Sequence, residues 1–142
     1  MPPTRSSPRP TAVDTSVLIA AERGGNFFEF IAAIPGEFYI PAHAAAEFLA
    51  GTHPPAKELL RERARRIYEN LFREIVEPFE EADAAQLAAL NAELRRTDNS
   101  MKLYDAAIAA TVMARGDSLL ALDSDFDRLS NRLNLIKYPA VH

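Results

Sequence analysis

Residues 101–123 read MKLYDAAIAATVMARGDSLLALD, which predicts a helix followed by a buried strand. Apolar side chains recur at helical spacing over residues 101–116, and Gly116 is a residue type that commonly ends helices. Residues 118–122 (SLLAL) form an apolar run as long as a short strand, and the run stops at Asp123. A helix that leads into a fully apolar strand is typical of a parallel sheet with helices on both faces, so we predict an α/β fold.

The rest of the chain alternates in the same way. Apolar runs predict strands at 11–14, 37–40 and 133–138, with a weaker strand at 74–79. Amphipathic or capped segments predict helices at 16–23, 26–34, 42–51, 56–73 and 81–96, with a short helix or turn at 123–129. Asn26 is the expected N-cap of the second helix, and residues 97–100 are expected to cap the helix that follows them. Right-handed crossovers are expected to join the strands.

The chain has 142 residues, the length of one domain, and its 48% hydrophobic and 25% charged residues are typical of a soluble globular protein. It has no cysteine, which excludes disulfides, thiolate zinc sites and cysteine nucleophiles. Its three histidines are scattered, so oxygen atoms would hold any metal, which favours magnesium or manganese. The net charge of −4 argues against broad, sequence-blind adhesion to nucleic acid.

Residues 1–10 contain four prolines, and we expect them to form a flexible tail before a domain that spans residues 11–142. The tail lacks the apolar segment of a secretory signal. No run approaches the roughly 18 uncharged apolar residues that a bilayer crossing needs. We therefore expect a cytoplasmic protein with no membrane partner, and the lack of cysteine fits a reducing compartment.

Two aspartates each end a predicted strand. Asp14 follows the first apolar run and Asp123 follows SLLAL. In open parallel sheets, sites form beyond the carboxyl ends of strands and near a topological switch point. The side chains of Asp14 and Asp123 are therefore expected to lie close together.

Two further acids lie on apolar helix faces. Asp105 precedes Ile108 and Val112 on the stripe of its helix that faces the core, and Glu47 belongs to the small-residue helix at 42–51. Burying a carboxylate without a partner is costly, so we expect both acids to point towards a site at the edge of the core.

Each acid also has a simpler interpretation. Asp14 is an equally good candidate for the N-cap of the helix at 16–23. Glu47 alone is more typical of a solvated helix residue, and Asp105 is a first-turn acid that complements the helix dipole. Asp123, Asp125 and Asp127 could form a polar turn. The four acids together, in this order of elements, favour a shared site.

Four segments resemble, in order, the acidic motifs of the PIN domain, and the closest likeness is to VapC-type toxins of bacterial toxin–antitoxin pairs. The segments are VDTSVLIA (13–20), AAAEFLAG (44–51), YDAAIAATVMARG (104–116) and LLALDSDF (119–126). The resemblance covers residues 11–138 and rests on the ordered set, because each motif alone is common.

This resemblance implies a PIN-like three-layer sandwich, in which a mostly parallel sheet of four to five strands is flanked by helices. It implies four site acids, Asp14, Glu47, Asp105 and Asp123, with Asp125 as a fifth candidate and Ser16 as a support or substrate-binding residue. Which of Asp123 and Asp125 faces the metal stays open. Ala121 departs from the family, which often has Thr or Ser there.

The implied activity is magnesium-dependent hydrolysis of RNA by an endoribonuclease, with manganese as the alternative metal. A cation would neutralise the phosphodiester and activate water, and clustered carboxylates repel one another unless a cation binds among them. Asp14 and Asp105 are expected to bind the metal directly, and Asp123 directly or through water. Glu47 is expected to hold or deprotonate the attacking water. The resemblance also implies a homodimer and a cognate antitoxin whose tail covers the acidic pocket.

Other functions stay open. The chain could be a PIN-fold nuclease of RNA maturation, an inactive PIN-like binding module, or a receiver-like phosphoryl-transfer domain, for which Lys137 is poorly placed. Arg61, Arg63, Arg65 and Arg66 form a basic cluster on the 56–73 helix. We interpret this cluster as a solvated face with internal ion pairs in preference to an RNA contact, and both interpretations stay open for Arg95, Arg96 and Lys102.

Overall fold

A five-stranded parallel sheet runs through the centre of the computed structural model, which describes residues 8–24, 26–122 and 124–138. The strands are β1 (Thr11–Val13), β2 (Phe38–Pro41), β3 (Val76–Glu77), β4 (Ser118–Ala121) and β5 (Asn134–Lys137). Their spatial order is β3-β2-β1-β4-β5, and every neighbouring pair is parallel. The order changes direction at β1, so the topological switch point lies between β1 and β4.

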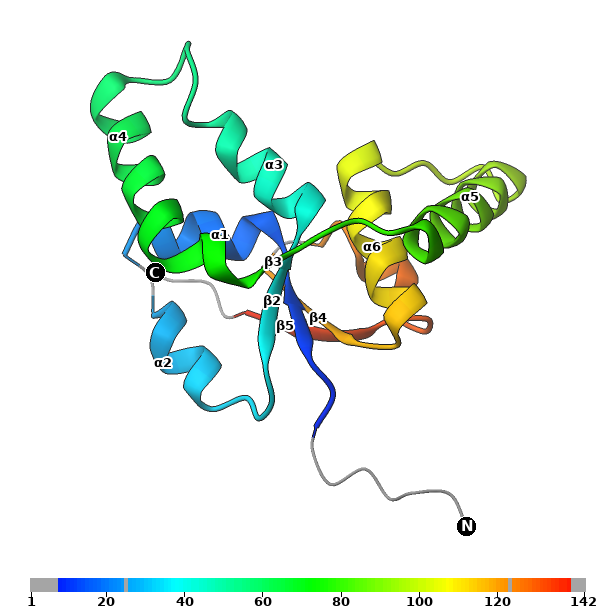
Figure 1. The fold of residues 1–142 in the computed structure, drawn as a ribbon. Helices are drawn as coiled ribbons and strands as arrows, with labels where there is room; N and C mark the ends of the chain where they lie inside the picture. Colours follow the sequence, from blue (N-terminus) through cyan, green and yellow to red (C-terminus); the bar gives the residue numbers. More distant parts are fainter. Residues whose placement is uncertain (1–7, 25, 123, 139–142) are drawn as a thin grey trace.

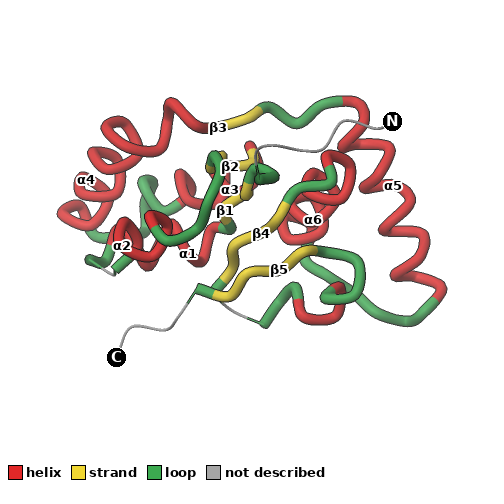
Figure 2. Tube along the Cα trace, turned by 90° about the horizontal axis from the view of Figure 1, so that it is seen from below, coloured by secondary structure: helices red, strands yellow, loops and turns green. Residues whose placement is uncertain are grey.

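Helices cover both faces of this sheet. They are α1 (Thr15–Glu22), α2 (Phe27–Ala32), α3 (Ala42–Ala50), α4 (Glu58–Ile67), α5 (Glu81–Arg96) and α6 (Leu103–Arg115). Figures 1 and 2 show α1, α2 and α4 on one side of the sheet and α5 and α6 on the other. The helix α3 begins where β2 ends and packs against both α1 and α6. The predicted three-layer α/β sandwich is confirmed.

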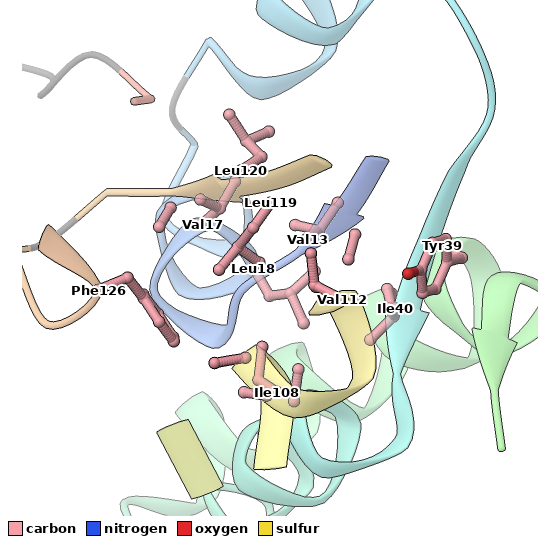
Figure 3. Packing of buried hydrophobic residues seen from close by; sticks show 14 of the residues in the cluster. Val13, Val17, Leu18, Tyr39, Ile40, Ile108, Val112, Leu119, Leu120 and Phe126 are labelled. Carbon is pink, nitrogen blue, oxygen red and sulfur yellow. The ribbon is translucent and has the colours of Figure 1, made fainter. Parts of the chain in front are cut away.

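The core lies between the central strands and the helices that cover them (Figure 3). Val13 of β1 and Leu120 of β4 are paired in register, and both are fully buried. Ile108 and Val112 of α6 are also fully buried, as their helical spacing predicts. Burying a side chain of this size stabilises the fold by about 1.5–3 kcal/mol, so α6 is held firmly against the sheet.

The predicted helix at 56–73 forms, but it is a regular α-helix only from Glu58 to Ile67. The α-helix ends at Ile67, a wider π-helical turn spans Tyr68–Phe72, and a 3₁₀ turn follows at Arg73–Ile75. The ring centroids of Tyr68 and Phe72 lie 6.5 Å and 5.4 Å from that of Phe48 in α3. Both rings thus pack on one aromatic side chain, and this tertiary packing overrides the regular helical period.

The two predicted caps have different outcomes. Asn26 occupies the N-cap position of α2 as predicted, but its side chain makes no capping bond and Oδ1 instead accepts a hydrogen bond from the Tyr138 hydroxyl at 2.8 Å. The cap predicted for α6 within residues 97–100 is wrong. The N-cap of α6 is Lys102, and the Lys102 side chain makes no capping bond.

None of the helices in the described ranges combines the length and apolar character that a bilayer crossing needs.

Candidate active site

The carboxyl edge of the sheet brings together the elements that carry the predicted acids. The backbone N–H of Asp14 donates to the Leu120 carbonyl at 2.9 Å, which joins the ends of β1 and β4 at the switch point. The helices α1 and α3 begin at this edge because they follow β1 and β2. The helix α6 also begins there, because its last turn leads into the start of β4 at the opposite edge.

Asp14 is buried at this edge, with 3% of its surface exposed. It is the N-cap of α1, and its Oδ2 accepts hydrogen bonds from the Ser16 N–H at 3.2 Å and the Ser16 hydroxyl at 2.6 Å. The same hydroxyl accepts a hydrogen bond from the Leu122 N–H at 3.1 Å. The capping interpretation of Asp14 is confirmed, and Ser16 fixes its carboxylate against the end of β4.

Asp105 lies in the first turn of α6 and is 8% exposed. It lines a cleft of about 340 Å³ together with Asp125, which is exposed on the segment after β4. The remaining lining residues are Ser100, Met101, Lys102 and Arg128. The structure therefore brings two of the predicted acids, Asp105 and Asp125, into one cleft.

Glu47 is half-buried on α3 and lines a second, more apolar groove of about 250 Å³. Ile19 of α1, Phe48 of α3 and Leu60 of α4 also line this groove. A hydrogen bond from the Thr15 hydroxyl to the Ala44 carbonyl at 3.4 Å ties the start of α1 to α3. Thr15 follows Asp14 directly, and Ala44 lies about one helical turn before Glu47. This hydrogen bond therefore links the segment of Asp14 to the helix of Glu47.

The fourth predicted acid, Asp123, lies outside the described residues. Within the ranges that the structure describes, no group of three or more acidic or histidine side chains could hold a metal ion. The convergence of Asp14, Glu47, Asp105 and Asp123 on one metal therefore stays a prediction.

Two basic residues line the cleft beside the acids: Lys102, which the sequence left open as an RNA contact, and Arg128, which it did not indicate. Lys102 precedes Asp105 by three residues, which places both at one end of α6, and this spacing could have indicated a shared cleft. Arg128 comes from a different part of the chain, and no sequence pattern indicated that it lines the same cleft.

The arginines of α4 are mostly bound to nearby groups. Arg63 donates to Glu22 at 2.7 Å, and this hydrogen bond raises the pKa of the Arg63 guanidinium. Arg65 pairs with Glu62, and Arg61 donates to the Ala56 carbonyl at 3.1 Å. These contacts favour the interpretation of this cluster as a solvated face.

Comparison with known proteins identifies the family. The model of the PIN domain family matches residues 11–131. VapBC2 of Rickettsia felis, bound to a promoter DNA fragment, has a similar structure with a TM-score of 0.76 and 15% identity, covering 92% of this chain and 99% of that chain. VapBC-5 of Mycobacterium tuberculosis, described as a toxin–antitoxin system, gives 0.74 and 22%, covering 94% and 100%.

VapC20 of Mycobacterium tuberculosis, a toxin that cleaves the sarcin–ricin loop, gives a TM-score of 0.64 and 18% identity, covering 90% of this chain and 99% of that chain. No curated protein matched the sequence. At these identities the similar structures show a shared fold alone. The family model spans most of the chain, so it also shows the family. The predicted PIN resemblance is confirmed, and the chain belongs to the PIN domain family.

Proposed function

We propose that this protein is a magnesium-dependent endoribonuclease and the toxin of a toxin–antitoxin pair. The observation that carries the proposal is the placement of two buried carboxylates, Asp14 and Asp105, at the carboxyl edge of a PIN-family sheet. Buried carboxylates are costly unless a cation or hydrogen-bond donors offset their charge, so this edge suits a divalent ion.

The donor set fits a hard metal ion, because the chain has no cysteine and the candidate ligands are all carboxylates. Asp14 and Asp105 would bind magnesium directly, and Asp123 would bind it directly or through water, with Asp125 as the alternative. Manganese would take the same oxygen ligands. When bound, the ion would neutralise the phosphodiester and make a water molecule more acidic.

The protein's own residues would perform the remaining steps. Ser16 would keep the Asp14 carboxylate in one orientation through its 2.6 Å hydrogen bond, as outer groups commonly do for metal ligands. Glu47, half-buried on α3, would accept the proton of the attacking water. As membership of the PIN family implies, hydrolysis would leave a 5′-phosphate and a 3′-hydroxyl.

A cognate antitoxin is the proposed partner, in a cytoplasmic complex in which the toxin is a homodimer. VapBC-5, which shares this fold, is a member of a family of toxin–antitoxin systems. On this chain, Leu60 of α4 lines the groove that contains Glu47 and is 47% exposed, and Leu59, the residue before it, is 76% exposed. An apolar antitoxin segment would cover these leucines, and its tail would block the acidic residues.

RNA cleavage assays test the enzymatic part of the proposal. Structured RNAs should be cut in the presence of magnesium and remain intact with chelator or with the Asp14→Asn and Asp105→Asn variants. Asp98→Asn is the matched control, because Asp98 is exposed and has a φ of 55°, which asparagine tolerates. Cleavage that survives chelation or both substitutions would overturn the mechanism, whereas a folded wild type that cuts no RNA with magnesium would favour an inactive, binding-only PIN module.

Expression assays separate a toxin from a nuclease of RNA maturation. A toxin should arrest growth when expressed alone, and co-expression of a small neighbouring gene product should relieve the arrest. An active nuclease that leaves growth unaffected would instead support the maturation function.

A further inference from the structure

The cleft that contains Asp105 and Asp125 also contains two cations, Lys102 and Arg128. We propose that Lys102 and Arg128 form a phosphate-binding pair that holds the RNA strand beside the acidic residues. This inference rests on the proposed nuclease function and adds the residues that grip the substrate.

Lys102 is placed by α6. It is exposed at the N-cap of this helix, three residues before Asp105, and both residues line the cleft. Among the described residues, Lys102 takes part in none of the ion pairs. Its ammonium group is therefore available to a ligand that enters the cleft.

Arg128 reaches the same cleft from the 3₁₀ turn Asp127–Leu129 after β4. One of its guanidinium nitrogens donates to the Ser100 carbonyl, which ties this turn to the loop before α6. A guanidinium carries five N–H donors, so this bond anchors Arg128 and leaves donors for an anion.

Charge favours an anionic occupant. The chain has a net charge of −4, and an RNA phosphate that approaches Asp105 and Asp125 is repelled unless cations lie beside it. Arg61, Arg63 and Arg65 of α4 contact carboxylates or carbonyls away from this cleft. Lys102 and Arg128, by contrast, border the acids. A simpler alternative is that the two cations only neutralise Asp105 and Asp125.

Salt-dependent RNA binding distinguishes these alternatives. The affinity of the full-length protein for a fluorescent single-stranded RNA is measured by anisotropy in chelator, so that no cleavage occurs, over a series of salt concentrations. Loss of one phosphate contact reduces the slope of log affinity against log salt by about 0.7. We expect this reduction in Lys102→Ala and in Arg128→Gln, and about twice this reduction in the double variant.

Two substitutions serve as matched controls. Lys57→Ala removes an exposed lysine that is likewise the N-cap of a helix, α4, and Arg96→Gln removes an exposed arginine from the last turn of α5. Arg128→Gln keeps an amide that can donate to the Ser100 carbonyl. Thermal melting checks the fold of each variant, and Lys102→Ala alone decides the outcome if Arg128→Gln does not fold.

The outcomes separate this inference from the proposed function. The Lys102→Ala and Arg128→Gln variants could instead show the same salt slopes as the controls and bind magnesium more tightly in a thermal-shift titration. That result would mean that the two cations only balance the acids, and it would overturn the inference. In that case the wild type would still cleave RNA. Failure of the wild type to bind or cleave RNA would overturn the proposed function and this inference with it.

Discussion

Asp14 combines a structural role as N-cap of α1 with the proposed role of metal ligand. Asparagine caps helices about as well as aspartate, whereas alanine cannot cap. We therefore expect Asp14→Asn to leave the free energy of unfolding nearly unchanged and Asp14→Ala to lower it by about 1 kcal/mol. Both variants should lose RNA cleavage, because neither offers a carboxylate.

Denaturant unfolding and RNA cleavage measure the two roles of Asp14 separately. Ser16→Ala is an informative companion, because it removes the hydroxyl that contacts both Asp14 and the Leu122 N–H. If Asp14→Asn were as unstable as Asp14→Ala yet fully active, the capping role alone would explain the residue.

Tyr39 makes the stability of the protein sensitive to alkaline pH. Burial first, and then the 2.8 Å hydrogen bond that its hydroxyl donates to Asp117, raise the pKa of Tyr39 well above the usual value. The neutral hydroxyl is thus favoured in the folded chain, while an unfolded tyrosine ionises near pH ~10. Its contribution to stability is present below that pH and is lost progressively above it.

We expect Tyr39→Phe to be less stable than the wild type at neutral pH, by about 1–2 kcal/mol, because the hydrogen bond to Asp117 is lost. Above pH ~10 the stability of the variant should fall less steeply with pH than that of the wild type. Denaturant unfolding across this range measures the slope. Burial also raises the pKa of Tyr138, so some pH dependence should persist in the variant. Identical slopes would show that Tyr39 does not cause the effect.

Two helices end at glycines whose φ angles have opposite signs. Gly116 ends α6 with a φ of 68°, whereas Gly51 ends α3 with a φ of −70°. Only the first conformation is disfavoured for a residue with a Cβ atom. A Cβ atom at Gly116 would also lie 2.7 Å from the flexible end of the Arg9 side chain, which can move aside.

Gly116→Ala should therefore lower the free energy of unfolding by about 1 kcal/mol through backbone strain. Gly51→Ala is the matched control, since its Cβ atom would meet only the Phe48 carbonyl at 3.4 Å. It should be neutral or slightly stabilising. Equal losses in the two variants, measured by denaturant unfolding, would contradict the argument from φ.

Magnesium binding should be visible in the stability of the protein as a whole. An ion that binds only the folded chain stabilises it by about 2.7 kcal/mol at one hundred times its Kd. The melting temperature of the wild type should therefore rise as magnesium is added, and the rise should be lost in Asp105→Asn. Asp98→Asn should behave as the wild type does. A wild type that melts at the same temperature with magnesium and with chelator would argue against a metal site.

The local sequence was sufficient to predict the regular elements and the α/β class. Apolar periodicity identified α5, α6 and β4, and Gly116 marked the end of α6, because these signals depend on residues close together in the chain. The acidic motifs predicted the PIN family, which the family model confirms. The cap formed by Asp14 was predictable too, since capping is a local property.

Tertiary contacts decided what periodicity could not. The π-helical turn after α4 forms where Tyr68 and Phe72 meet Phe48, and the side chain of Asn26, the N-cap of α2, bonds to Tyr138 in place of the helix backbone. Arg128 reaches the cleft of Asp105 from a segment that follows β4. These contacts join residues far apart in the chain, and their energies depend on how whole elements pack, so no local pattern encodes them.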